Sequence, residues 1–313
     1  MEIIQPEKLK RGDAIGIISP SSPVSHREKL DLAVGYFENR GYKVKVGIHA
    51  MKERGYLAGT DEERVSDIHR MFLDREVKLI ICLRGGYGAS RLLDRIDYKI
   101  IKNNPKIFCG YSDVTVLQNA FFCKTGLVTF AGPMAGVDFY KDVSHFTEEN
   151  FWKTITSGAI IKIKNPNGEK LNSLRSGIAE GRLIGGNLAL FTSLIGTKYL
   201  PDPRGKILFL EEVGEVPYRI DRMLNQLRLS GYLEKVKGVV LGSFADCEET
   251  DQERKSLKLE EVLDDYFVKD FDGPVIYNLK HGHLIDSLTI PIGVNVRIDG
   301  GNCSMEFLEC HLD

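Results

Sequence analysis

The sequence has no excess of charge of either sign. Lys and Arg together number 42, Asp and Glu number 44, and the formal net charge is −2. A protein that binds nucleic acid or a membrane surface carries a basic patch, and the even balance of charges argues against one. We therefore expect the partners to include neither nucleic acid nor a membrane.

Long hydrophobic runs are missing as well. No stretch reaches the roughly 18 consecutive apolar residues that a membrane-spanning helix needs. The first residues, MEIIQPEKLKRGDAIGIISP, contain no apolar segment of signal-peptide length behind a basic start. These two absences predict a cytoplasmic protein.

Paired cysteine motifs are also absent. None of the six Cys has the C-x-x-C spacing of a zinc site or a redox motif, and most of them stand in apolar or strand-like runs. We interpret them as free thiols, which suit a reducing compartment, and we expect neither a metal nor a cofactor. They are Cys82, Cys109, Cys123, Cys247, Cys303 and Cys310.

The sequence does have the composition of a globular protein. Hydrophobic residues make up 42% and charged residues 27% of its 313 residues, a length typical of about two domains. Short apolar runs predict buried strands, and segments with hydrophobic residues at helical spacing follow them. The predicted strands cover 14–20, 42–46, 77–83 and 106–109, and the predicted helices cover 26–40, 61–73, 89–96 and 112–122.

Strands that alternate with helices predict an α/β fold with a parallel sheet. In such sheets the ligand crevice lies at the carboxyl ends of the strands. A polar stretch at 157–176 interrupts the pattern, so we predict one domain at 1–160 and a second at 175–313. Within the second domain, strands are predicted at 207–210 and 236–242, helices at 218–230 and 257–267, and further strands in the tail.

Gly110-Tyr111-Ser112-Asp113 joins a predicted strand to a predicted helix through a sharp turn. A Ser in such a turn stands above the sheet beside the first amides of a helix, as in a nucleophile elbow. The N–H of Asp113 could then donate to an oxyanion. Val114 stands where G-x-S-x-G has its second Gly, which disfavours an ordinary α/β-hydrolase, and a helix N-cap explains Ser112 as well.

Arg84-Gly85-Gly86-Tyr87-Gly88 follows another predicted strand. Three glycines at a strand end let a ligand approach the backbone closely. A phosphate cradle is one interpretation, but neither G-x-G-x-x-G nor G-K-[ST] is completed. A turn that supplies an oxyanion amide fits equally well, as does a plain strand-to-helix turn.

Two later segments contain an acid and a base. Glu211 and Glu212 follow the predicted strand 207–210, where a carboxylate can orient a histidine, although acids at strand ends are often merely solvated. His281-Gly282-His283 lacks a third metal ligand at useful spacing, so a general base fits better than a metal site. A structural role for His283 stays open. The order Ser, Glu, His is compatible with a catalytic triad.

At these residues the chain resembles the LD-carboxypeptidases, serine peptidases that cleave the L-to-D peptide bond beside a terminal D-amino acid. The resemblance covers nearly the whole chain. Its blocks are Ile17-Ile18-Ser19-Pro20-Ser21, Ala58-Gly59-Thr60, the segment from Arg84 to Arg91, Gly110-Tyr111-Ser112-Asp113, Gly132-Pro133-Met134, Gly185-Gly186-Asn187-Leu188, Leu210-Glu211-Glu212, the segment from Pro217 to Leu224, Leu241-Gly242-Ser243-Phe244, Gly282-His283 and the segment from Leu288 to Gly293.

The resemblance implies a catalytic triad. Ser112 is the nucleophile, His283 the general base and Glu211 the third member, with Glu212 standing where the family usually has Asp. The family fold implies an N-terminal α/β domain that carries Ser112 and a smaller, β-rich C-terminal α/β domain that carries the acid and the base. Such enzymes usually act as homodimers, with the site at the domain interface.

The resemblance also assigns substrate-binding groups. The oxyanion donors correspond to the backbone of Gly86 and Asp113, and Arg84 is a candidate for binding the terminal carboxylate of the substrate.

Three functions are compatible with the sequence. The first is the release of D-alanine from a murein tetrapeptide during peptidoglycan recycling. The second is a serine amidase on a peptidyl-nucleotide antibiotic, like the microcin C self-immunity peptidases, which calls for an aromatic platform. Trp152 is the single Trp, and its amphipathic segment is more typical of a core. The third is a non-catalytic protein that binds a small ligand, in which Ser112 is only a cap.

Overall fold

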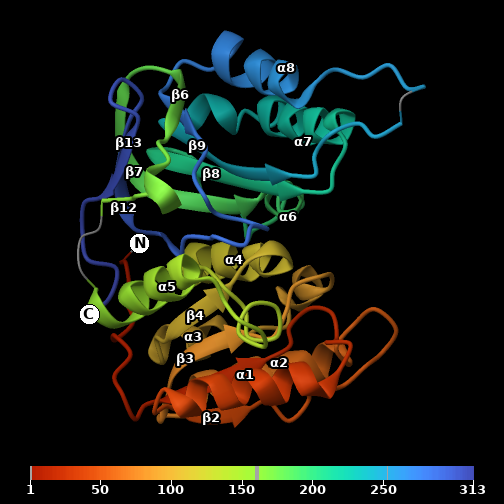
Figure 1. Ribbon diagram of the computed structural model, residues 1–313, viewed down its shortest axis with the longest axis vertical. Helices are drawn as coiled ribbons and strands as arrows, with labels where there is room; N and C mark the ends of the chain where they lie inside the picture. The colour runs from red at the N-terminus through yellow and green to blue at the C-terminus, as the bar shows by residue number, and fades with distance from the viewer. Residues whose placement is uncertain (1, 159–161, 252) are drawn as a thin grey trace. The chain divides into compact units, whose positions relative to one another are not determined.

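The computed structural model describes residues 2–158, 162–251 and 253–313. The chain forms two compact units. Unit 1 comprises residues 1–159, 288–293 and 310–313, and unit 2 comprises residues 160–287 and 294–309 (Figure 1). The second predicted domain, 175–313, thus differs from unit 2, because two short C-terminal segments pack with unit 1.

A largely parallel sheet forms the centre of unit 1. Its strand order is β11-β5-β4-β3-β1-β2, and all neighbours are parallel except β11, which is antiparallel to β5. The strands are β1 (Ala14–Ile18), β2 (Lys43–Val46), β3 (Val77–Cys82), β4 (Ile107–Gly110), β5 (Thr129–Ala131) and β11 (Ile290–Ile292). The helices are α1 (Arg27–Asn39), α2 (Asp61–Leu73), α3 (Tyr98–Asn103), α4 (Thr115–Thr125) and α5 (His145–Ser157).

Local sequence explains where these elements begin and how they pack. Thr60 accepts a hydrogen bond from the backbone of Glu63 while the Glu63 carboxylate accepts one from the backbone of Thr60, so α2 begins with the predicted capping box. Phe72 of α2, Phe108 of β4 and Phe121 of α4 form an aromatic cluster, with the last two ring centroids 4.9 Å apart. Such burial of large rings fixes helices against a sheet.

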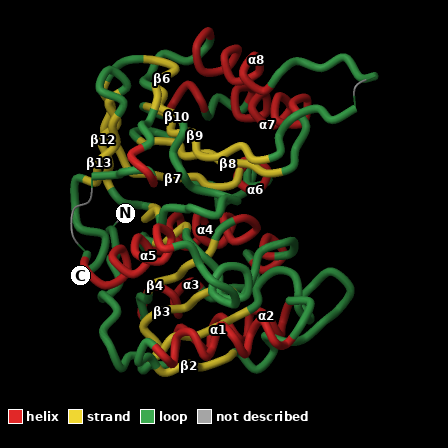
Figure 2. Tube along the Cα trace, viewed as in Figure 1, coloured by secondary structure: helices red, strands yellow, loops and turns green. Residues whose placement is uncertain are grey.

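A mixed sheet forms the centre of unit 2 (Figure 2). Its strand order is β13-β12-β7-β8-β9-β10-β6, with β7 to β10 parallel and the flanking strands β12, β13 and β6 antiparallel to their neighbours. The strands are β6 (Asn172–Arg175), β7 (Ile178–Asn187), β8 (Lys206–Val213), β9 (Gly238–Ala245), β10 (Val275–Tyr277), β12 (Asn295–Asp299) and β13 (Ser304–Phe307). The helices are α6 (Leu188–Thr192), α7 (Pro217–Leu229) and α8 (Leu259–Asp264).

Two predicted elements differ from the structure in a way that concerns the site. The predicted helix at 89–96 is a short 3-10 segment at Ala89–Leu92. The predicted helix at 112–122 begins with a 3-10 turn, and its α-helical part starts at Thr115. Ser112 has φ of 62°, outside the right-handed helical region, so regular helix cannot start there. None of the described helices is both long and apolar enough to cross a membrane.

Candidate active site

Ser112 occupies a strained turn at the carboxyl end of β4. Tyr111 separates it from the strand, and the residue itself is half-buried. Its positive φ of 62° is uncommon for a residue with a side chain. Backbone strain of this kind costs roughly 1–3 kcal/mol and clusters at functional sites. The geometry matches the sharp strand-to-helix turn that the sequence predicts.

Ser112 does not occupy an N-cap position, the role considered above as an alternative to catalysis. The residue before the 3-10 turn is Tyr111 and the residue before α4 is Val114. Neither position carries a side-chain capping hydrogen bond. The presence of a Ser at residue 112 is therefore explained better by its place in the strained turn than by helix capping.

The glycine-rich turn passes directly beside Ser112. β3 pairs with β4 in parallel register, so the turns that follow the two strands leave the same edge of the sheet. A Cβ atom placed on Gly85 would lie 3.2 Å from Ser112 Oγ and 3.5 Å from the amide nitrogen of Asp113. Gly86, the next residue, is exposed. Unit 1 thus brings together Ser112, the Asp113 amide and the predicted oxyanion turn.

Arg84 stands at the start of this turn and is half-buried. Its Nη1 donates to the carbonyl oxygen of Pro23 at 3.1 Å. The bond anchors one side of the guanidinium to the loop after β1, and the assignment of Arg84 to a substrate carboxylate stays a prediction.

The side chain of Asp113 has a structural partner that the sequence did not indicate. It is fully buried, and its Oδ2 accepts a hydrogen bond of 2.8 Å from the N–H of Ala89, at the end of the glycine-rich turn. Burial raises the pKa of this carboxyl group above its ordinary value. Asp113 therefore connects the turn after β3 to the turn after β4. A buried Asp in an unremarkable helix start gives no sequence signal for such a contact.

Unit 2 brings the predicted acid and base together. Glu211 Oε2 lies 3.2 Å from His283 Nδ1. The Glu211 side chain is 1% exposed and the His283 side chain 25% exposed, so the carboxylate is enclosed while the imidazole reaches solvent. β8 runs to Val213, which places Glu211 within the strand rather than after it. A buried carboxylate behind a partly exposed imidazole is the arrangement of the acid and base in a triad.

Glu212 is engaged elsewhere. Its carboxylate accepts hydrogen bonds from Asn187 Nδ2 at 2.8 Å, from the N–H of Ala189 at 2.8 Å and from the N–H of Val213 at 2.9 Å. Burial raises its pKa, since desolvation outweighs these donors. Successive side chains of a strand point to opposite faces, so Glu211 and Glu212 have separate surroundings. Glu212 holds the start of α6 against β8.

The backbone conformation at residue 282 and its closeness to Glu211 explain why a glycine precedes His283. Its φ is 122°, a conformation that residues with a side chain rarely adopt. A Cβ atom there would lie 2.7 Å from Glu211 Oε2. The missing side chain lets the loop approach the carboxylate closely enough for the contact with His283.

His281, the other histidine of this loop, is 1% exposed and packs edge-on against the Phe209 ring, with the centroids 5.3 Å apart. It is a core residue. Among the described residues, no group of three or more His, Cys, Asp or Glu side chains is arranged to hold a metal ion.

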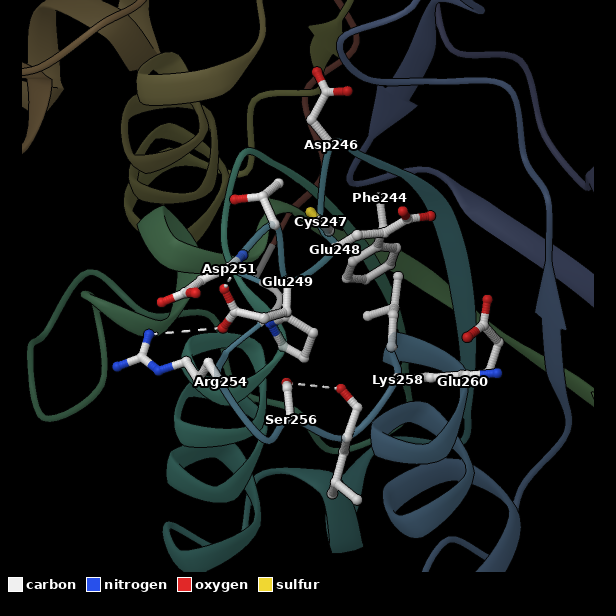
Figure 3. A pocket seen from close by; sticks show the side chains of 14 residues that line it. Phe244, Asp246, Cys247, Glu248, Glu249, Asp251, Arg254, Ser256, Lys258 and Glu260 are labelled. Carbon is white, nitrogen blue, oxygen red and sulfur yellow. Dashed lines mark hydrogen bonds and ion pairs between the residues drawn. The ribbon is translucent and has the colours of Figure 1, made fainter.

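Unit 2 also contains a polar cavity of about 950 Å³ near the carboxyl ends of β8 and β9 (Figure 3). Five of the described residues in its wall are acidic and two are basic, and Arg254 pairs with Glu249 at 3.6 Å. Neither Glu211 nor His283 is among the described residues that line it. The described residues that line it are Pro217, Phe244, Asp246, Cys247, Glu248, Glu249, Thr250, Asp251, Arg254, Ser256, Leu257, Lys258, Leu259 and Glu260.

Comparison with known proteins assigns the family. Residues 15–132 match the LD-carboxypeptidase N-terminal domain, and residues 180–298 match the LD-carboxypeptidase C-terminal domain. The chain belongs to the LD-carboxypeptidase family. It is accordingly a carboxypeptidase of the serine peptidase class, as the sequence resemblance implied.

Relatives of this LD-carboxypeptidase cover almost its full length. The probable murein peptide carboxypeptidase of Bacillus subtilis is 42% identical, over 94% of this chain and 91% of the relative. The crystal structure of muramoyltetrapeptide carboxypeptidase from Oxalobacter formigenes has a TM-score of 0.83 at 34% identity, covering 94% of this chain and 97% of that one. Microcin C7 self-immunity protein MccF has a TM-score of 0.90 at 29% identity, covering 99% and 100%. The predicted α/β fold is confirmed by these similarities.

Proposed function

We propose that the chain hydrolyses the L-to-D peptide bond before the terminal D-alanine of a murein tetrapeptide. The observation that carries the proposal is the contact of 3.2 Å between buried Glu211 and partly exposed His283. The strained position of Ser112 supports it from unit 1. The names of the relatives from Bacillus subtilis and Oxalobacter formigenes support the choice of substrate.

In the proposed mechanism, Ser112 Oγ attacks the carbonyl carbon of the residue before D-alanine. His283 Nε2 takes the hydroxyl proton, and the carbonyl oxygen becomes an oxyanion that accepts hydrogen bonds from the amides of Gly86 and Asp113. Collapse of this intermediate breaks the C–N bond, and the imidazolium returns the proton to the D-alanine amine. A water molecule then hydrolyses the acyl-enzyme by the same route and regenerates Ser112.

Glu211 has two tasks in this mechanism. Its carboxylate, beside His283 Nδ1, selects the tautomer in which Nε2 carries no proton and can accept one. It also stabilises the imidazolium that forms in each half-reaction. The proposal assigns these tasks to Glu211 and not to Glu212, because the Glu212 carboxylate already accepts three hydrogen bonds.

The setting of the reaction is part of the proposal. A cytoplasmic, homodimeric enzyme would act on peptides recovered from the cell wall, and Arg84 would bind the carboxylate of the terminal D-alanine. The second Nη atom of Arg84 supports this role, since the bond to Pro23 uses Nη1.

The decisive experiment is incubation of the protein with murein tetrapeptide, followed by mass measurement. We expect conversion to tripeptide with release of one D-alanine. Two controls accompany it: a tetrapeptide that ends in L-alanine, which should stay intact, and Ser112→Ala, which should be inactive. An unchanged tetrapeptide, or turnover by Ser112→Ala at the native rate, would contradict the proposal.

A second candidate substrate is a peptidyl or aminoacyl nucleotide, favoured by the TM-score of 0.90 with MccF. One MccF structure is a complex with aspartyl sulfamoyl adenosine. Trp152 offers no platform for a base, because it stacks on the Tyr42 ring at 5.1 Å and donates from Nε1 to the Tyr36 hydroxyl. Aspartyl sulfamoyl adenosine, assayed beside the tetrapeptide, separates the two. The better substrate is the one with the higher kcat/KM.

The non-catalytic alternative is tested with a serine-directed phosphonate. Covalent labelling of the native protein, absent in Ser112→Ala, supports the hydrolase. A protein that binds ligand but takes no label would support the alternative.

A further inference from the structure

Arg64 is a fully buried arginine in the first turn of α2, with its side chain 0% exposed. Arginine is almost never completely buried unless its charge is paired and its donors are satisfied. The first question is therefore what the guanidinium group holds, and the second is why a residue of this type is needed there.

The guanidinium joins two loops at the carboxyl edge of the unit 1 sheet. Nη1 donates to the carbonyl oxygen of Pro20, after β1, at 2.6 Å. The same nitrogen donates to the carbonyl oxygen of Gly88, at the end of the glycine-rich turn, at 3.0 Å. β1 and β3 are neighbours in the sheet, so Arg64 ties together the turns that follow adjacent strands.

The charge of Arg64 is compensated within α2. Its Nη2 donates to Asp61 Oδ1 at 2.6 Å, and Asp61 also accepts hydrogen bonds of 3.0 and 2.9 Å from Arg91. Arg95 adds a further ion pair at 3.8 Å. Because Arg91 and Arg95 remain as partners, loss of Arg64 would not leave Asp61 as an uncompensated buried charge.

Gly88 shows how closely the arginine approaches the turn. Its φ is 122°, and a Cβ atom there would lie 2.7 Å from Arg64 Nη1. The Gly-Gly-Tyr-Gly turn therefore ends in glycine for a reason of its own: the chain must pass directly over a buried guanidinium.

The same turn is held at three further points. Ala89 donates its N–H to the buried Asp113 carboxylate at 2.8 Å. Tyr87 donates its N–H to Ser22 Oγ at 3.1 Å, and Ser22 donates its own N–H to the carbonyl oxygen of Gly85 at 3.4 Å. The two ends of the turn are thus fixed independently on either side of Gly86.

We propose that Arg64 is a positioning residue that fixes the Gly86 amide of the oxyanion site through its hydrogen bonds to Gly88 and Pro20. The inference rests on the proposed function, which gives Gly86 its role. Arg64 acts through the backbone and does not touch substrate. Its planar guanidinium holds two carbonyl groups with Nη1 and the Asp61 carboxylate with Nη2, and the single nitrogen of a lysine cannot reproduce this arrangement.

The kinetic consequence follows from what an oxyanion donor does. It interacts with the transition state more strongly than with bound substrate, so a displaced amide lowers kcat and leaves KM nearly unchanged. A misplacement of about 1 Å costs on the order of 10²-fold in rate. A merely structural arginine would instead change the melting temperature and leave the kcat of the folded fraction intact.

The test compares Arg64→Met with Arg91→Met. Both variants remove donors to Asp61, but among the described residues the Arg91 side chain makes no hydrogen bond to the turn. The Arg91 backbone N–H donates to the Gly88 carbonyl oxygen at 3.2 Å, and this bond is present in both variants. We expect Arg64→Met to lose about 100-fold in kcat with KM within about threefold of native, and Arg64→Lys to recover part of the loss. Arg91→Met should keep kcat within about threefold. Equal kcat values for Arg64→Met and the native enzyme would overturn the proposal.

Ser22→Ala keeps the proposal testable if the Arg64 variants do not fold. Ser22 is half-buried, and its substitution removes the hydroxyl that accepts from Tyr87 N–H. We expect about a tenfold loss in kcat at unchanged KM, since one of several ties to the same turn is lost. A native kcat for Ser22→Ala, with the Arg64 variants unfolded, would count against a positioned turn.

A boronate transition-state analogue provides a readout that folding alone does not move. Its affinity should fall with kcat in the Arg64 and Ser22 variants, while the affinity for the tripeptide product should not. Failure of this inference is distinguishable from failure of the proposed function. If Ser112→Ala is inactive and the turn variants are native-like, only Arg64 is misassigned. If Ser112→Ala is active, the proposed function itself is wrong.

Discussion

The candidate residues of unit 1 depend mainly on backbone groups, whereas those of unit 2 contact each other through side chains. Ser112 stands beside amides whose positions depend on Arg64, Asp113 and a turn that is rich in glycine. Glu211 and His283 contact each other directly. The comparison teaches that the carboxyl-terminal part of a strand can support catalysis in two ways: it can position backbone amides, or it can bury a charged side chain. The two arrangements should respond differently to substitution.

The largest expected effect is the loss of the nucleophile or the base. Ser112→Ala and His283→Ala should each lower kcat by on the order of 10⁶, and the double variant should be little worse than either, because triad members act as a unit. Tetrapeptide turnover measures the effect, with melting temperature as the control for folding. Losses that multiply in the double variant would mean that the two halves do not serve one mechanism.

Loss of the acid, Glu211, should have the next largest effect on kcat. Glu211→Gln should lower kcat by on the order of 10⁴, because the imidazole loses its tautomer preference and the support of its cation. Glu212→Gln should change kcat only modestly but lower the free energy of unfolding by about 1–3 kcal/mol, since the NH2 group that replaces one carboxylate oxygen cannot accept, and at least one of three buried donors loses its partner.

Steady-state kinetics and urea denaturation of both glutamine variants provide the measurement. An inactive Glu212→Gln variant together with an active Glu211→Gln variant would mean that Glu212, not Glu211, is the triad acid. Native activity in both variants would mean that neither carboxylate takes part in the mechanism.

A smaller effect is expected from the loop that carries His283. Gly282→Ala should lower kcat by about 10²-fold, because the new Cβ would meet the Glu211 carboxylate and displace the acid from the base. Gly177→Ala is the matched control. Its φ of 124° is close to the 122° of Gly282, and a Cβ there would meet only Pro274, at an ordinary contact distance of 3.6 Å, so the strain in φ is comparable and the acid is untouched. Similar kcat values in the two variants would show that strain alone, and not the contact with Glu211, accounts for the glycine.

The smallest expected effects are on the pH dependence of stability. They are tested on one buried acid from each unit, Asp61 and Glu212. Hydrogen bonds from Arg91 and Arg64 hold the pKa of Asp61 below its ordinary value of 3.8. Its contribution to stability is therefore present above that value and lost as the pH falls through the lower, folded-state pKa. Burial raises the pKa of Glu212 above its ordinary value of 4.5, so its contribution is present below that value and lost as the pH rises through the folded-state pKa.

Urea midpoints between about pH 3 and pH 7 test these opposite signs. The stability difference between the native chain and Asp61→Asn should shrink toward low pH. The stability of the native chain relative to Glu212→Gln should increase as the pH falls. The same direction of change in both pairs would contradict the assignment of the pKa shifts.

Local sequence was sufficient for much of the fold. The capping box at Thr60 and Glu63, the apolar strands of unit 1 and the α7 segment are defined by neighbours in the chain, and the structure confirms them. α3, β5 and α5 were not predicted. α5 depends on packing: Phe151 is buried, and its neighbour Trp152 stacks on the distant Tyr42. Patterns within one segment do not contain such contacts.

The sequence by itself determined the family, through ordered blocks that include Gly-Tyr-Ser-Asp and Gly-His. It also indicated that a glycine-rich turn and a Ser would both lie at the carboxyl ends of strands in a parallel sheet. That the two strands are neighbours came from the structure. Only the tertiary structure decided which of two adjacent glutamates contacts His283, since that depends on which face of β8 the loop approaches. Only the structure brought Arg64 beneath the turn, because a buried charge is indistinguishable in sequence from a solvated one until its partners fold around it.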